Sequence, residues 1–384
     1  MLNSCDCYTN IQKLFDISIG DRLVLTQAQL LKVRLMTEGL VVPQETRLNL
    51  QSPLTLADYP STSGITMVID NDVWVNAPFV DFNPNFVKNP PHKLVLRGGS
   101  FFVESENREY RVRVLPVPSY HDKRTTDGQP YIWYAVTHSD RVRISPVGGC
   151  AMACWFCDIP YSAQYHKKSV ENLVESVKVA LEDQILPARH VLISGGTPRP
   201  NDYDWENIVY ERVVHAFPQI HVDIMMVPMP GLLNVRKLEA SGIHGLSINI
   251  EMWNQETARR IMASKVKAGR KLYLDFIEEA VHVFGSKGRI RSLILVGIES
   301  LESTLEGVEA LAQRGCDPVL SPFRPDPATP MRYHRPPSVD ILIEAYERSL
   351  EIVERYGVKL GPRCIPCQHN TLTFNDGTGA YSYS

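Results

Sequence analysis

The chain has 384 residues, of which 44% are hydrophobic and 22% charged, which allows a large α/β barrel and a smaller domain. A formal net charge of −3 and the lack of Lys/Arg-rich tracts argue against nucleic acid as a partner. No apolar run approaches the roughly 20 residues of a membrane span, and residues 1–16 lack a signal-peptide pattern. We therefore expect a cytoplasmic protein without a membrane partner.

Residues 1–140 are predicted to form a β-rich accessory domain. A short helix is expected over residues 26–36. Short β-type runs flank the turn residues Asp70-Asn71-Asp72 and Gly98-Gly99, which predicts two hairpins: 65–69 with 73–75, and 93–96 with 100–103. Further strands are expected at 110–115 and 131–136.

Residues 141–367 alternate between apolar strand-like runs and amphipathic segments, which is typical of a parallel sheet. The expected strands are 142–145, 190–193, 221–227, 245–251, 292–297 and 318–322. The expected helices are 170–182, 205–216, 234–240, 255–263, 272–284, 303–314 and 339–356. Six βα units predict an α/β fold, a partial (βα)6 barrel of the TIM type, whose site would lie at the carboxyl ends of the strands. A polar tail covers 368–384.

Three cysteines, Cys150, Cys154 and Cys157, follow the first predicted barrel strand at C-x-x-x-C-x-x-C spacing. Iron–sulfur clusters are held by Cys thiolates, and four thiolates close a [4Fe–4S] cluster. Three therefore leave one iron open to a substrate or cofactor. A zinc site with His166 as fourth ligand is the alternative.

The run Cys150-x-x-x-Cys154-x-Phe156-Cys157 resembles the radical S-adenosylmethionine (radical SAM) superfamily. The resemblance implies that the open iron binds S-adenosylmethionine and that one electron cleaves it to methionine and a 5′-deoxyadenosyl radical. This radical would abstract hydrogen from the substrate. It also implies that Phe156 packs near adenine and that an electron donor such as flavodoxin or ferredoxin is a partner.

Two later strand ends resemble cofactor-binding segments of the superfamily. Gly195-Gly196-Thr197 resembles the motif that holds the methionine amino group, with Thr197 in place of a Glu, so that the contact would be mainly through backbone. Ser247, Asn249 and Glu251 share one face of the fourth strand. That strand resembles the segment of biotin and lipoyl synthases on the ribose and sulfonium side; a solvent-facing edge is the alternative.

The fifth and sixth strands resemble the adenine-binding regions of lipoyl synthases, biotin synthases and hydrogenase maturases. The residues implied there are Val296, Gly297 and Ser321. A cation for the cofactor carboxylate is expected after the fourth strand, with no preference among Arg259, Arg260, Arg270 and Lys271.

Four further cysteines occur in two short-spaced pairs, Cys5 with Cys7 and Cys364 with Cys367. In a cytoplasmic chain such pairs favour metal binding over disulfides. Together they would supply four thiolates to a second iron–sulfur cluster, a parallel to lipoyl synthase. Structural zinc and unlinked thiols remain alternatives.

The sequence therefore predicts a radical SAM enzyme that uses a [4Fe–4S] cluster and S-adenosylmethionine on a small or carrier-bound biosynthetic substrate. A second cluster would allow sulfur insertion, as in lipoyl and biotin synthases. Rearrangement or C–C bond chemistry without sulfur transfer is the alternative. A non-enzymatic iron–sulfur or zinc protein is the other class.

Overall fold

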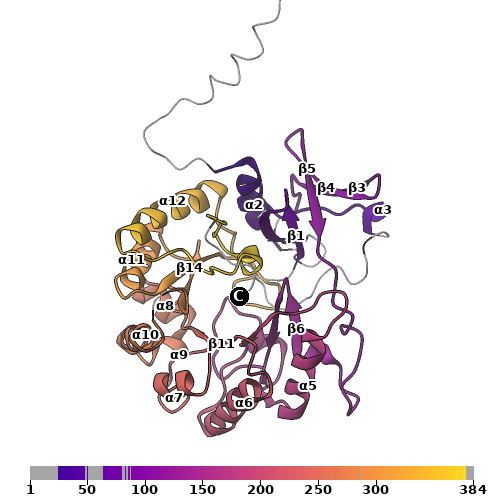
Figure 1. The fold of residues 1–384 in the computed structure, drawn as a ribbon. Coiled ribbons are helices and arrows are strands. Elements are labelled where there is room, and N and C mark those ends of the chain that lie inside the picture. The colour runs from indigo at the N-terminus through magenta and orange to yellow at the C-terminus, as the bar shows by residue number, and fades with distance from the viewer. Residues whose placement is uncertain are drawn as a thin grey trace, which may run out of the picture.

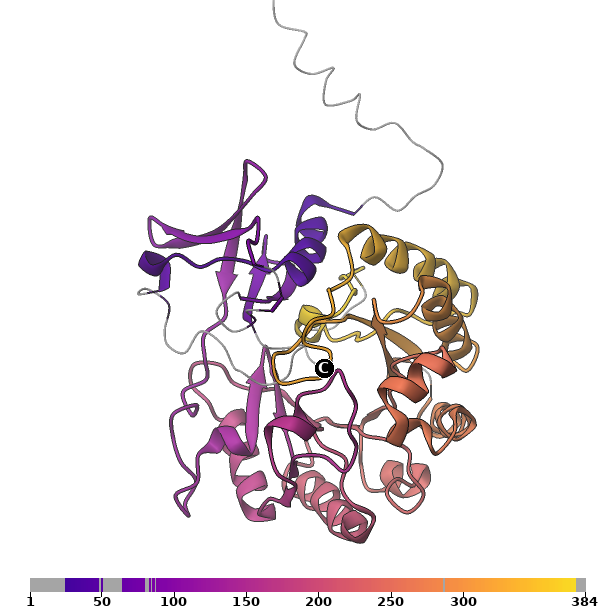
Figure 2. The same cartoon turned by 180° about the vertical axis from the view of Figure 1, so that it is seen from behind.

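The computed structural model describes residues 25–47, 50, 64–79, 83, 85–86, 88–285 and 287–377. The predicted ligands Cys5 and Cys7 lie outside these residues. The described part contains a five-stranded and a seven-stranded sheet (Figures 1 and 2). Its helices are too short or too polar to traverse a lipid bilayer.

The smaller sheet is antiparallel, with the order β2-β1-β5-β4-β3. Its strands are β1 (Ile65–Ile69), β2 (Val73–Ala77), β3 (Lys93–Arg97), β4 (Ser100–Ser105) and β5 (Arg108–Val114), with helices α2 (Gln27–Glu38) and α3 (Gln44–Arg47) beside it. Both predicted hairpins are confirmed. Gly98 and Gly99 join β3 to β4 with φ of 55° and 76°, as a two-residue primed turn requires.

The larger sheet has the order β14-β13-β12-β11-β10-β7-β6, in which only β6 is antiparallel. Its strands are β6 (Ala135–His138), β7 (Arg141–Ile144), β10 (His190–Ile193), β11 (Val222–Met225), β12 (Gly245–Ser247), β13 (Ile290–Val296) and β14 (Asp317–Pro322). The sheet curls into a half-barrel with helices around its outer side (Figure 1). The predicted partial (βα)6 barrel is confirmed.

Amphipathic helices connect the parallel strands or, in the case of α12, follow the last one, and they bury their apolar faces in the core. They are α5 (Val170–Leu181), α6 (Tyr203–Ala216), α7 (Val235–Ala240), α8 (Gln255–Ile261), α9 (Ala263–Val266), α10 (Arg270–Phe284), α11 (Leu301–Ala312) and α12 (Val339–Arg355). Side-chain oxygens cap many of their first turns, for example Ser169 for α5, Ser300 for α11 and Ser338 for α12.

Two expected strands differ from the structure. Residues 131–136 were expected as one strand, but Tyr131–Trp133 forms the 3₁₀ helix η1 and β6 begins only at Ala135. The Tyr131 hydroxyl donates to Glu175 Oε1 at 2.6 Å, which holds this turn on α5. The fourth barrel strand ends at Ser247 rather than continuing to residue 251. Beyond it, side-chain acceptors interrupt the backbone pairing with β13: Ser292 Oγ accepts from the Ile250 N–H, and Asn249 Oδ1 accepts from the Leu293 N–H.

The smaller sheet and the barrel are joined by buried polar contacts. Arg324, after β14, donates to Oδ1 and the backbone oxygen of Asn76 in β2, at 2.7 and 2.5 Å. Lys32 of α2 donates to the backbone oxygens of Gln368 and Thr373, at 2.8 and 2.7 Å. Both cations are buried, so these contacts satisfy groups that would otherwise be costly to bury.

Residues 361–374 run along the open side of the half-barrel. The Leu372 N–H donates to Leu320 O of β14 at 2.9 Å, and the segment carries the 3₁₀ helix η3 (Pro366–Asn370). Figure 1 shows this yellow segment between β14 and β6. This segment therefore lies along the edge strand β14.

Candidate active site

A cavity of about 1000 Å³, open solvent included, lies inside the half-barrel. Residues at or after the carboxyl ends of β7, β10, β12 and β14 line it, among them Cys157, Gly195, Asn249, Glu251 and Arg324. This is the end of a βα barrel where catalytic residues gather. The cavity also extends to Arg141 at the amino-terminal end of β7, to His138 at the end of β6 and to Asn370 of the C-terminal segment.

The cysteine loop begins after β7 and runs through Cys150, Cys154 and Cys157, all free thiols that are partly buried. Cys150 Sγ accepts hydrogen bonds from the N–H of Thr197 at 3.1 Å and of Met152 at 3.3 Å. Burial raises the pKa of the Cys154 thiol to about 12 and raises that of Cys157 as well. Both thiols therefore keep their protons unless a cationic group binds them.

Gly195 and Gly196 allow the loop after β10 to touch the cysteine loop. A Cβ on Gly196 would lie 1.7 Å from Gly149 O, and one on Gly195 would lie 2.0 Å from Ser145 Oγ. The Ala151 N–H donates to Thr197 O at 2.9 Å across the same contact. The sequence pattern predicted that these glycines let a ligand approach the backbone. In the structure the close contact between the two loops already requires them, and Gly195 also lines the cavity.

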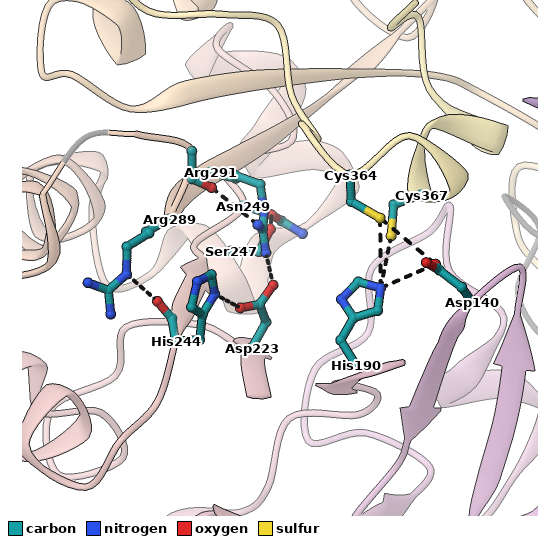
Figure 3. Close-up of polar contacts among 11 residues, drawn as sticks. Asp140, His190, Asp223, His244, Ser247, Asn249, Arg289, Arg291, Cys364 and Cys367 are labelled. Atoms are coloured by element: carbon teal, nitrogen blue, oxygen red, sulfur yellow. Dashed lines mark hydrogen bonds and ion pairs between the residues drawn. The ribbon is translucent and has the colours of Figure 1, made fainter. Parts of the chain in front are cut away.

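Asn249 lies beside the cavity with its amide oxygen already engaged. Oδ1 accepts from Ser247 Oγ at 2.8 Å and from the Leu293 N–H at 3.1 Å (Figure 3 shows Asn249 and Ser247). Among the described residues Nδ2 has no such partner, so it is the atom of Asn249 left for a ligand. Ser247 positions Asn249 and does not line the cavity itself.

Glu251 forms a buried ion pair with Lys265, a residue that sequence reasoning missed. Lys265 Nζ lies 2.8 Å from Glu251 Oε2, and the two side chains are only 8% and 14% exposed. Glu251 itself has φ of 61°, an uncommon backbone conformation for a residue with a side chain. Although burial lowers the pKa of Lys265, the charge of Glu251 raises it above its usual value. The one feature of the sequence that could have pointed to Lys265 was Glu251, because a buried carboxylate needs a cation as its partner.

Of the remaining predicted cofactor residues, two line the cavity and two do not. Phe156 and Ser321 line the cavity, and Ser321 Oγ donates to Asn370 O at 3.4 Å. Val296 is buried on the face of β13 that packs on the helices, since Leu293 and Leu295 line the cavity instead. Gly297 has φ of 101°, and a Cβ there would lie 2.7 Å from Pro337. Neither the Val296 side chain nor Gly297 thus lines the cavity.

Arg259 and Arg270 lie on α8 and α10, at a smaller pocket that Lys265 also lines. Arg270 stacks on Trp253, with its guanidinium carbon 3.8 Å from the ring centre. Lys271 pairs with Asp275 on the surface and is 86% exposed. Of the cations after the fourth strand, the missed Lys265 is thus the buried one that contacts a predicted site residue.

Cys364 and Cys367 lie at the opposite end of the barrel, beside His190 and Asp140 (Figure 3). The sulfur atoms lie 3.8 and 3.4 Å from His190 Nε2, respectively. Sequence reasoning did not anticipate His190 or Asp140 as neighbours of this pair.

The donor set of the cysteine loop suits a cluster better than a single ion. In the described part of the chain, the one group of three or more metal-ligating side chains whose donor atoms lie within 4.8 Å of one another is that around His190. Cys150, Cys154 and Cys157 are more widely spread, whereas ligands of one zinc ion lie about 3.3–3.8 Å apart, from bond lengths of 2.0–2.3 Å. His166, the alternative zinc ligand, instead contacts Gln164 O at 2.9 Å.

Residues 144–323 match the family model described as the Radical SAM superfamily. These 180 of the 384 residues form a radical SAM domain. Such a domain implies a [4Fe–4S] cluster and S-adenosylmethionine as cofactors. Three cysteines on one loop next to a cavity are a donor set that fits them.

The chain is similar to curated proteins of different activities. It is 27% identical over 139 residues to the bacteriochlorophyllide c C-7(1)-hydroxylase of Chlorobaculum limnaeum, covering 36% of this chain and 35% of that protein. It is 28% identical over 183 residues to the GTP 3′,8-cyclase of Aliarcobacter butzleri (strain RM4018), covering 46% of this chain and 53% of that protein. The chain thus spans about a third and about half of the lengths of these curated relatives.

Two solved structures resemble the fold. A radical SAM methyltransferase from Sphaerobacter thermophilus is 15% identical with a TM-score of 0.45, over 71% of this chain and 76% of that one. The FeFe-hydrogenase maturase HydG from Carboxydothermus hydrogenoformans is 14% identical with a TM-score of 0.46, over 60% of this chain and 56% of that one.

Proposed function

We propose that this radical SAM enzyme abstracts a hydrogen atom from a small biosynthetic substrate, or from the reactive end of a carrier-bound one. When bound, the cluster and S-adenosylmethionine supply reductive cleavage to a 5′-deoxyadenosyl radical. Cys150, Cys154 and Cys157 would hold the cluster, and Phe156, Gly195 and Asn249 Nδ2 would contact the cofactor. The observation that carries the proposal is the cavity that adjoins Cys157 and all three of these residues.

The size of the cavity argues for a small substrate. Ligand sites in proteins typically enclose about 300–1000 Å³. The cavity of about 1000 Å³ includes open solvent and would be shared between cofactor and substrate. The substrate would lie toward His138, Arg141 and Asn370, on the side of the cavity away from the cysteine loop.

Apolar side chains around the cavity would limit the access of water to the reaction. Phe156, Leu293, Leu295 and Phe323 give its wall an apolar part, which keeps a reactive radical from side reactions. The ion pair of Glu251 with Lys265 neutralises the one acidic side chain among the lining residues. The free thiols suit a reducing cytoplasm, where flavodoxin or ferredoxin would supply the electron.

Sulfur insertion would require a second iron–sulfur cluster as the sulfur source. It remains a narrower proposal, to which the two relatives named as a hydroxylase and a cyclase give no support. Hydrogen abstraction followed by rearrangement or C–C bond chemistry needs only the first cluster.

The test is formation of 5′-deoxyadenosine by the anaerobically reconstituted and reduced protein after addition of S-adenosylmethionine. We expect the nucleoside from the wild type and from Cys316→Ala, which alters a buried cysteine outside the site. Cys154→Ala should give none. A wild type that forms no more nucleoside than Cys154→Ala would contradict the proposal.

A further inference from the structure

Four metal-ligating side chains converge at the amino-terminal end of the barrel strands. Asp140 immediately precedes β7 and His190 begins β10, and these strands are parallel neighbours. Cys364 and Cys367 approach them from the C-terminal segment. The two cysteines and the histidine are buried, and Asp140 is partly buried. This is the end of the barrel opposite to the cysteine loop.

Four of the six distances between the donor atoms match the edges of a zinc tetrahedron. Zinc bonds of about 2.3 Å to sulfur and 2.0–2.2 Å to nitrogen or oxygen place neighbouring donor atoms roughly 3.3–3.8 Å apart. His190 Nε2 lies 3.4 Å from Asp140 Oδ1, 3.4 Å from Cys367 Sγ and 3.8 Å from Cys364 Sγ. Cys364 Sγ lies 3.8 Å from Asp140 Oδ1.

Hydrogen bonding among these groups does not account for the convergence. Nε2 of a histidine carries one proton or one lone pair, so it serves one good hydrogen bond. Two sulfurs and a carboxylate oxygen nevertheless approach this single atom, as the dashed lines in Figure 3 show. A cation at their common centre satisfies all four donors at once.

The donor geometry also distinguishes one ion from a second iron–sulfur cluster. In a cubane each thiolate binds a different iron, so its ligands spread around the cluster. Here all four ligand atoms lie within 4.8 Å of one another. Two sulfurs, one nitrogen and one carboxylate oxygen in a tetrahedral set are typical zinc ligands.

We infer that Asp140, His190, Cys364 and Cys367 bind one Zn²⁺ ion that closes the amino-terminal end of the half-barrel. Four protein ligands leave no open coordination position, which makes the site structural rather than catalytic. Two thiolates and a carboxylate around Zn²⁺ carry a net charge of −1. Arg141 lies close enough to act electrostatically on Cys367 and offsets this charge.

The ion would attach the C-terminal segment to the barrel strands β7 and β10. Arg363, one residue before Cys364, forms a bidentate ion pair with Asp317 at the start of β14. Nε donates to Oδ2 at 2.7 Å and Nη2 donates to Oδ1 at 3.0 Å. Cys364 and Cys367 then reach β7 and β10. Since β14 and β7 lie toward opposite edges of the open sheet, the ion would join the two edges through residues 363–367.

Metal analysis of the whole protein tests this inference without any need for S-adenosylmethionine cleavage. We expect about one zinc per chain that resists EDTA, both in the wild type and in a triple Cys150/Cys154/Cys157→Ala variant that lacks the cluster ligands. The double variant Cys364→Ala/Cys367→Ala should lose the zinc and keep about four iron atoms after reconstitution. Cys316→Ala, a buried cysteine elsewhere, should retain both metals.

X-ray absorption at the zinc edge of the triple variant decides the ligand set even if the double variant does not fold. We expect two sulfur neighbours at about 2.3 Å and two nitrogen or oxygen neighbours at about 2.0 Å. Four sulfur neighbours would overturn the assignment of Asp140 and His190. Iron and sulfide retained by the triple variant in place of zinc would show a second iron–sulfur cluster and overturn the inference, as would a wild type without bound metal after EDTA.

Discussion

Replacing Lys265 by Met tests whether Glu251 depends on its buried partner. The change leaves the Glu251 carboxylate, 14% exposed, without the Nζ that lies 2.8 Å away. Removing one partner of a buried ion pair typically costs about 3–5 kcal/mol. For a chain of 384 residues we expect the melting temperature to fall by roughly 4–6 °C.

Thermal unfolding of the anaerobic proteins measures this loss of stability, and a second substitution isolates the contribution of the pair. Lys265→Met/Glu251→Gln removes both charges and should be more stable than Lys265→Met alone. Lys271→Met is the matched control, because Lys271 pairs with Asp275 in solvent and is 86% exposed. A Lys265→Met melting temperature within about 1 °C of the wild type, or a double variant no better than the single one, would refute the reasoning.

Three further substitutions have expected outcomes. Gly196→Ala places a Cβ 1.7 Å from a backbone oxygen of the cysteine loop and should abolish iron binding, measured as iron per chain, whereas Gly98→Ala, with no atom within 4 Å, should not. Arg324→Met removes two buried hydrogen bonds to Asn76 and should cost about 3 kcal/mol, seen as a lower melting temperature and faster limited proteolysis. Burial raises the pKa of Glu206 to about 8, above its value when unfolded, so wild-type stability should fall as pH rises through about 8, and Glu206→Gln should show a flatter profile.

The sequence predicted the barrel well because each strand and helix carries its own periodic signal. β10 occupies His190–Ile193 as expected, since a short apolar run there is bounded by polar residues. The strand expected over 245–251 is shorter, with only its bridge from Glu251 to Ile294 beyond Ser247. Alternation placed Ser247 and Asn249 on one face but could not show that their side chains bind each other and β13.

The sequence could not predict contacts between distant segments. Lys265 follows Glu251 on a short helix among several other cations, and only the fold brings its side chain to that carboxylate. His190 and Cys367 are 177 positions apart, and no local pattern joins them. The pairing of Cys364 and Cys367 with Cys5 and Cys7 stays a prediction, because the latter two lie outside the described residues.

The two ends of the barrel are connected through the C-terminal segment. Asn370 lines the cavity three positions after Cys367, and its backbone oxygen accepts from Ser321, a predicted cofactor residue. Lys32 fixes the same segment from the smaller sheet side through Gln368 O and Thr373 O. An ion bound at Cys367 would thus set the position of the cavity wall near the proposed substrate position. Loss of that ion should therefore weaken substrate binding more than it weakens binding of S-adenosylmethionine near the cysteine loop.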